Sequence, residues 1–139
     1  MRSTILLALF SLAFTAKAQF TLDWSYFTST TYDIDETGAY INPNYSEQLR
    51  EWNDKDVLIV GYIVPLNVQL RTYVISAYPM QQCFFCGGAG PETVIQLYFK
   101  DSPPRLLTDQ YVILKGRLKL EQQKPGSFFF TLYQTELAG

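Results

Sequence analysis

The sequence predicts an all-β fold, a small barrel closed by five strands. Five runs rich in apolar and β-branched residues, separated by turn signals, follow one another between residues 57 and 135. The first run is long and has Gly61 in its middle, where a strand can bend to turn a barrel corner. Closure also removes the exposed sheet edges of so short a chain. These observations favour a barrel like those that bind oligonucleotides or oligosaccharides (an OB-like barrel) over a small β-sandwich.

The chain begins with the pattern of a signal peptide over residues 1–18. Arg2 gives a positive start, residues 5–14 form a short apolar run, and Ala16-Lys17-Ala18 has the A-x-A form of a cleavage site. The run is shorter than the about 20 residues of a membrane-spanning helix, which disfavours an uncleaved anchor or a buried N-terminal helix. Cleavage leaves 121 of the 139 residues, enough for one domain. We therefore expect an exported protein, periplasmic or secreted, without a membrane span.

Charge and composition exclude several classes of function. Without residues 1–18, nine basic side chains accompany 13 acidic ones, a net charge of −4. This balance lacks the dense basic surface of nucleic-acid-binding proteins, so no nucleic-acid partner is expected. Histidine is absent, which removes the usual general base near neutral pH and the commonest metal ligand. No catalytic residues are predicted, and an enzyme is the less favoured class.

Residues 19–56 form an aromatic and acidic segment ahead of the barrel. Apolar and polar residues alternate over Leu22–Thr28, which predicts a short strand. Ser46 is placed to cap a short helix over residues 47–52, with an acidic residue in its first turn. Two turn signals precede that helix: Thr37-Gly38 and Asn42-Pro43-Asn44.

Residues 57–139 contain the predicted barrel. In the fourth strand, apolar residues alternate with Lys115, Arg117 and Lys119, so one face is expected in the core and the other in solvent. Between the third and fourth strands, Pro103-Pro104 leaves room for at most one helical turn. A turn is expected over Gln122–Gly126. The five predicted strands cover residues 57–64, 71–77, 93–99, 111–120 and 127–135.

The unusual chemistry is concentrated between the second and third strands, in residues 78–92. This segment, called the cysteine loop below, contains both cysteines of the chain in a C-x-x-C arrangement, Cys83 and Cys86, followed by Gly87-Gly88-Ala89-Gly90. The glycines allow the backbone to bend tightly beside the cysteines. The cysteine pair has three interpretations: a metal site, a disulfide, or a thiol–disulfide exchange centre.

Metal binding is the leading interpretation. Met80, Cys83 and Cys86 are three sulfur-containing residues spaced evenly by three, and sulfur ligands select Cu(I). Structural Zn(II) needs four ligands, so a zinc site would require Glu92 or another carboxylate, or two chains. The cofactor expected is therefore Cu(I) or Zn(II), and the partner a second copy of the chain or another envelope protein.

Two other interpretations compete with the metal site. An exported chain meets an oxidising compartment, where a Cys83–Cys86 disulfide would form in an otherwise non-catalytic binding or scaffold module. The closed loop is so small that such a bond would stabilise the fold only slightly. A thiol–disulfide redox protein is the third interpretation. It is weaker because the glycines after Cys86 do not start the helix that lowers the pKa of a reactive cysteine.

Trp24, the strand Val57–Leu66 with its V-x-x-x-G-Y-x-x-P-L pattern, and Cys83 after the next strand together resemble a family of exported bacterial proteins of uncharacterised function. The resemblance covers most of the chain after residue 18. It implies an OB-like fold and a metal-related role in the envelope. In that family the loop cysteine is often followed by a histidine and a proline-rich run; here Phe84-Phe85-Cys86-Gly87-Gly88 takes that place.

Overall fold

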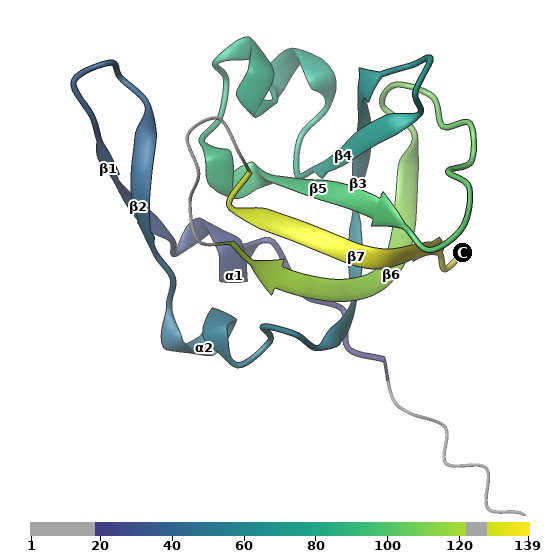
Figure 1. Cartoon of the computed structure of the whole chain (residues 1–139), viewed down its shortest axis with the longest axis horizontal. Coiled ribbons are helices and arrows are strands. Elements are labelled where there is room, and N and C mark those ends of the chain that lie inside the picture. The colour runs from purple at the N-terminus through teal and green to yellow at the C-terminus, as the bar shows by residue number, and fades with distance from the viewer. Residues whose placement is uncertain (1–18, 122–127) are drawn as a thin grey trace, which may run out of the picture.

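Five strands close into a barrel in the computed structural model, which describes residues 19–121 and 128–139 (Figure 1). The order around the barrel is β3-β4-β5-β7-β6, with β6 returning to β3. Neighbours are antiparallel except β5 and β7, which are parallel. This is the five-stranded Greek-key arrangement of an OB-like barrel, so the predicted fold class is confirmed. The strands are β3 Asp56–Asn67, β4 Thr72–Ser76, β5 Val94–Phe99, β6 Tyr111–Leu120 and β7 Phe130–Leu137.

Strand positions agree closely with the predicted runs. β6 has the predicted bounds, and its buried and exposed residues alternate along its length, with Leu114 and Leu118 fully buried and Arg117 exposed. The predicted signal peptide, residues 1–18, and the predicted turn at Gln122–Gly126 lie outside the described residues.

Gly61 marks the barrel corner that the sequence predicts. The first half of β3 pairs with β6 and the second half with β4, and the exchange of partners occurs at Tyr62. A Cβ atom on Gly61 would lie 2.5 Å from the carbonyl oxygen of Ser76 in β4. The missing side chain therefore allows the two strands to approach each other at the bend.

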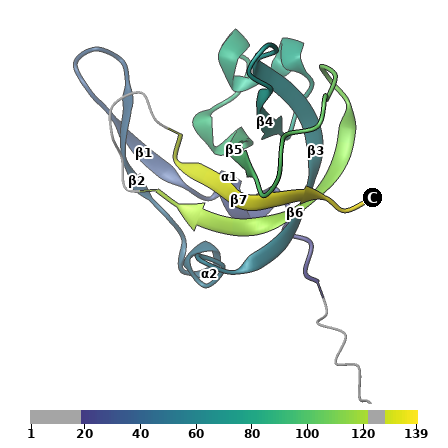
Figure 2. The same ribbon diagram turned by 45° about the vertical axis from the view of Figure 1, so that its right-hand side comes forward.

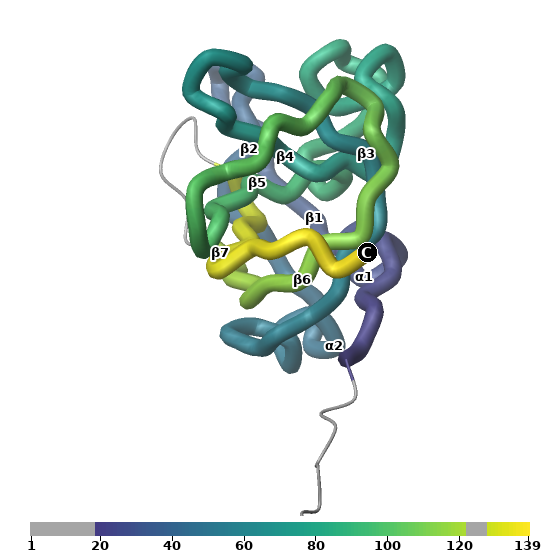
Figure 3. The backbone as a smooth tube through the Cα atoms, turned by 90° about the vertical axis from the view of Figure 1, so that its right-hand side faces the viewer, coloured from purple at the N-terminus to yellow at the C-terminus, as the bar shows by residue number. Residues whose placement is uncertain are grey.

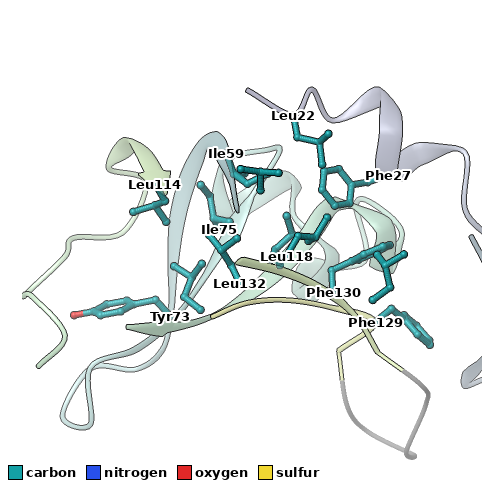
Figure 4. Packing of buried hydrophobic residues seen from close by; sticks show 14 of the residues in the cluster. Leu22, Phe27, Ile59, Tyr73, Ile75, Leu114, Leu118, Phe129, Phe130 and Leu132 are labelled. Carbon is teal, nitrogen blue, oxygen red and sulfur yellow. The ribbon is translucent and has the colours of Figure 1, made fainter. Parts of the chain in front are cut away.

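The core lies inside the barrel and extends under the N-terminal segment (Figure 4). Leu22 and Phe27, from that segment, point toward barrel side chains that include Ile59 and Phe130. Phe27 is fully buried and meets the edge of the Phe130 ring, with 5.1 Å between the ring centroids. Residues 19–56 therefore close one side of the core.

The strand predicted at Leu22–Thr28 is wrong. The segment forms a short helix, α1 (Ser25–Thr28), preceded by a single bridge from Thr21 to Leu58. The Asp23 carboxylate accepts a 2.8 Å hydrogen bond from the Ser25 amide, which starts the turn. Trp24 and Phe27, three residues apart, then pack against the core on one side of the helix. Burial of these two rings favours a helix here over the strand that the alternating pattern predicts.

Strands β1 (Thr31–Ile34) and β2 (Tyr40–Asn44) form a hairpin that projects from the barrel (Figures 1 and 2). The turn predicted at Thr37-Gly38 is present, and Gly38 has φ of +85°. The turn predicted at Asn42-Pro43-Asn44 is wrong, because these residues belong to β2. A residue with positive φ in a strand, Asn42 at +49°, breaks the regular register there.

Helix α2 (Glu47–Arg50) begins at the predicted cap and ends two residues earlier than predicted. The Ser46 hydroxyl accepts a 3.2 Å hydrogen bond from the Leu49 amide. Leu49 is fully buried, and the ring of Trp52 stacks on that of Phe20 at 4.5 Å. The helix thus fixes residues 19–56 to the barrel.

Three loops gather at one end of the molecule, opposite α2 (Figures 1 and 3). They are the β3–β4 turn, residues 100–110 between β5 and β6, and the cysteine loop. Residues 100–110 contain no helix, as Pro103-Pro104 predicts. Within residues 19–121 and 128–139, no helix has the length and apolar character needed to cross a membrane.

Candidate metal centre in the cysteine loop

The cysteine loop folds as three single-turn 3₁₀ helices above β4 (Figure 1). They are η1 (Met80–Gln82), η2 (Phe84–Cys86) and η3 (Pro91–Thr93). Pro91 at the first position of η3 leads the chain into β5, as its fixed φ favours. Short 3₁₀ turns, rather than an α-helix, follow from the glycine-rich composition.

The loop covers the outer face of the barrel at β3, β4 and β5. Val64, Val74 and Val94, one from each strand, form a second buried cluster outside the main core. Phe84 from the loop and Phe128 pack against this cluster. In OB barrels the face built on the second and third strands is the usual ligand-binding face. Here the cysteine loop occupies part of that face.

Main-chain hydrogen bonds hold the two cysteines in one tight turn. The Cys83 carbonyl oxygen accepts from the amides of Cys86 and Gly88, both at 3.2 Å. Gly87 has φ of +75°, a conformation that favours glycine. A Cβ atom on Gly88 would lie 2.9 Å from the Gln82 carbonyl oxygen. The glycines that follow Cys86 in sequence are therefore required by this turn.

The two thiols differ in exposure. Cys83 is fully buried, whereas Cys86 is exposed, and both are free thiols in this structure. The Cys86 thiol donates to the Met80 carbonyl oxygen, with 2.9 Å between Sγ and O. Partial desolvation raises the pKa of Cys86, and the neighbouring Cys83 thiol makes a smaller contribution in the same direction. The two cysteines therefore lie at the boundary between core and solvent.

The main chain of Met80 lies against the second cysteine. Its carbonyl oxygen contacts the Cys86 thiol, and its amide donates a 2.7 Å hydrogen bond to Oδ1 of Asp109 in the neighbouring loop. The Met80 side chain is partly exposed. Asp109 therefore anchors the first turn of the cysteine loop to the rest of the barrel.

Glu92 is not brought into the site. Its carboxylate folds back over Gly90, where a Cβ atom would overlap it. Burial is the main cause of the raised pKa of Tyr32 in β1, and the negative charge of Glu92 raises it further. Among the residues that the structure describes, no group of three or more cysteine, histidine or acidic side chains could hold a metal ion. Glu92, which the sequence offers as a possible zinc ligand, is therefore placed over Gly90 and near Tyr32 of the β1–β2 hairpin.

The sequence interpretation missed the aromatic contacts that surround the cysteines. Phe84 lies against Tyr40 of the hairpin and against Phe85, with ring centroids 6.2 and 5.6 Å apart. Phe85 in turn meets Phe128 at 5.9 Å. The two phenylalanines inside the C-x-x-C arrangement were the available signal, because adjacent aromatic residues in a loop need a surface to pack against.

Two neighbouring thiols, one of them accessible, support two kinds of chemistry. Loss of both protons gives a pair of thiolates that can ligate a soft cation. Loss of two electrons and two protons to an oxidant gives a disulfide instead. A raised pKa at the exposed thiol reduces the thiolate fraction and so disfavours a nucleophilic redox role.

No protein-family model, curated protein or solved structure matches this chain.

Proposed function

We propose that this chain is an exported envelope protein, periplasmic or secreted, that binds a soft metal ion through Cys83 and Cys86. The observation that supports the proposal most directly is the pair of free, neighbouring thiols held in one turn by the Cys83 carbonyl oxygen. The signal-peptide pattern over residues 1–18 and the resemblance of the Gly61-Tyr62 strand to exported bacterial proteins support the location.

The ligand set favours Cu(I) over Zn(II). Cu(I) prefers soft sulfur donors and tolerates low coordination numbers, so two thiolates suffice, with the Met80 thioether as an available third ligand. Zn(II) in structural sites takes four ligands, and Glu92 does not supply one. Cys83 lies beneath the surface, which would leave the ion partly enclosed with Cys86 on its accessible side. Such a site suits uptake and transfer of an ion better than its permanent storage.

The second candidate function is a binding or scaffold module with a Cys83–Cys86 disulfide. It is favoured by the closeness of the thiols in a chain whose start predicts export to an oxidising compartment. The two states exclude each other, because a disulfide offers no thiolate to a metal ion. The redox state of the purified protein therefore decides between them.

The decisive experiment is a titration of reduced protein with Cu(I) in the presence of a competing chelator. We expect one ion per chain, with binding lost in Cys86→Ser. This variant is preferred to Cys83→Ser because Cys86 is exposed and its replacement leaves the core unchanged. Met80→Leu, which conserves volume, is expected to weaken Cu(I) binding and to leave Zn(II) binding unchanged.

Two controls make the result interpretable. The thermal midpoint of each variant shows whether the fold is retained, and a thiol count on protein recovered from its own compartment gives the native redox state. Cu(I) binding that is equally weak in wild type and in Cys86→Ser contradicts the metal site. A thiol count of zero on the native protein favours the disulfide module.

A further inference from the structure

Two exposed tyrosine rings lie on the outer side of the barrel, where β5, β7 and β6 run side by side (Figure 1). Tyr98 of β5 and Tyr133 of β7 are 45% and 38% exposed. Their rings stack nearly parallel, with 5.0 Å between the centroids and 7° between the planes. Each ring covers only one face of the other, so the pair presents flat aromatic surface to solvent.

Hydrogen bonds hold the second tyrosine in place. Oε1 of Glu121 accepts from the Tyr133 hydroxyl at 3.1 Å and from the hydroxyl of buried Thr131 at 2.5 Å. The carboxylate, which follows β6, thus lies beside the aromatic pair with its position fixed. The surface therefore combines an ordered ring with an ordered hydrogen-bond acceptor before any ligand is bound.

A bulge in β7 brings a second carboxylate to the same side of the strand. Exposed Gln134 has φ of +51°, a conformation uncommon for residues other than glycine. Across this bulge, Tyr133 is opposite Arg117 and Glu136 is opposite Lys115. Alternate residues of β6 point to the same side, so Tyr133 and Glu136 both point outward. Bulges commonly re-aim side chains beside binding sites.

A pocket of about 200 Å³ continues this surface beyond the tyrosines. It is bounded by the end of β5, the end of β7 and the residues that follow β5. Glu136 and Thr135 contribute to its lining from β7, together with Phe99 and Asp101. A small space with both apolar contacts and hydrogen-bond acceptors suits one ring of a hydroxylated ligand.

Charge on this surface disfavours a nucleic acid. Four basic and five acidic side chains lie on β5, β6 and β7, in the two residues after each strand, or in ion pairs with these residues, a net charge of −1. Three of the four cations are paired, at 3.1 to 3.6 Å. A phosphate backbone requires an excess of basic side chains, whereas an uncharged sugar chain does not. The basic residues are Lys100, Lys115, Arg117 and Lys119, and the acidic ones are Asp54, Asp56, Asp101, Glu121 and Glu136.

We propose that Tyr98 and Tyr133, with Glu121, Gln134 and Glu136 beside them, bind an uncharged β-linked glycan of glucose or N-acetylglucosamine units. The ring substituents of these sugars are equatorial, which leaves flat C–H faces that pack on aromatic rings. The hydroxyls at the ring edge donate to carboxylates and pair with the amide. Barrels of this fold include oligosaccharide-binding proteins. The surface shares no residue with the metal site, so the two proposals stand or fall separately.

Isothermal titration calorimetry with cellohexaose and with chitohexaose tests the proposal. We expect the purified protein to bind at least one of these hexasaccharides, and Tyr98→Ala to bind it about tenfold more weakly. Tyr133→Phe retains the ring and loses the hydrogen bond to Glu121. Its affinity is expected to fall less than that of Tyr98→Ala. A single-stranded oligothymidylate, titrated in the same way, is expected not to bind.

Tyr111→Ala is the matched control. Tyr111, at the start of β6, is 63% exposed and also contacts a second tyrosine, Tyr62, but the two rings are inclined by 58°. This variant is expected to bind like wild type, and thermal midpoints show whether each variant is folded. The proposal is overturned if neither hexasaccharide binds, if Tyr98→Ala and Tyr111→Ala lose equal affinity, or if oligothymidylate binds through Tyr98.

Discussion

The Cys86 thiol donates to the carbonyl oxygen of Met80, with 2.9 Å between Sγ and O. This bond joins the second cysteine of the pair to the first turn of the cysteine loop, and Asp109 fixes that turn through the Met80 amide. A metal ion that takes Cys86 as a ligand must remove the thiol proton and so break the bond to Met80. Metal binding, loop geometry and protonation are therefore coupled at one atom.

Metal affinity is expected to rise with pH. Each thiol must lose its proton to bind, and the pKa of Cys86 is raised by desolvation and by Cys83. The apparent affinity for Zn(II), measured by competition, should therefore increase from about pH 6 to about pH 9, with up to two protons released per ion. A constant affinity over this range, after correction for the competitor, would show that the thiols are not the ligands.

Gly61→Val is expected to destabilise the fold by roughly 1–3 kcal/mol. The new side chain would have its Cβ atom 2.5 Å from the main-chain oxygen of Ser76, which cannot move without disturbing β4. The urea midpoint of unfolding measures the effect. Gly139→Ala is the control, because its Cβ would find only an ordinary contact at 3.6 Å. Equal midpoints for Gly61→Val and wild type would contradict a close approach at the barrel corner.

Gly88→Ala tests the role of the cysteine loop independently of the stability of the barrel. A Cβ atom at residue 88 would lie 2.9 Å from the Gln82 carbonyl oxygen, so the turn that holds both cysteines must open. We expect weaker metal binding, by about tenfold, with the thermal midpoint changed by only a few degrees, because the barrel core is not involved. A variant with wild-type affinity would show that this turn does not position the thiols.

Stability is expected to fall above about pH 10, the pKa of an unfolded-state tyrosine. The Tyr45 hydroxyl donates to the carbonyl oxygens of Glu121 and Phe129, at 2.8 and 3.0 Å, and burial raises its pKa well above the usual value. The unfolded chain then loses this proton at a lower pH than the folded chain, so rising pH favours unfolding.

Denaturation midpoints measured between about pH 8 and about pH 11 test this dependence. Tyr45→Phe is expected to lower stability at pH 8, since two hydrogen bonds are lost, and to flatten the pH dependence. Burial also raises the pKa of Tyr32. Part of the pH dependence of stability is therefore expected to remain in Tyr45→Phe. A slope in Tyr45→Phe as steep as in wild type would refute the assignment to Tyr45.

Local patterns in the sequence were enough to predict the barrel. The alternation along β6 separates Leu114 and Leu118 from Arg117 because neighbouring residues of a strand point to opposite faces. The strand bend at Gly61 and the helix cap at Ser46 could also be predicted, because each depends on the chemistry of a single residue. Nothing beyond the sequence was needed to identify the cysteine loop as the unusual part of the chain.

Tertiary structure decided what local patterns could not. Leu22–Thr28 alternates like a strand, but burial of Trp24 and Phe27 against the barrel makes it a helix. Pro43 belongs to strand β2 of the β1–β2 hairpin, although the local sequence pattern predicts a turn there. Such choices depend on the apolar surface that distant segments offer, and a local window of sequence does not contain that surface.

The same distinction holds at the candidate site. The spacing of Cys83 and Cys86 follows from the sequence alone, and so does the absence of histidine. Only the fold determines that Cys83 is buried, that Cys86 is exposed, and that Glu92 turns toward the hairpin. The reason is physical: spacing along the chain limits which atoms can meet, whereas packing of the loop against Val64, Val74 and Val94 selects which of them do.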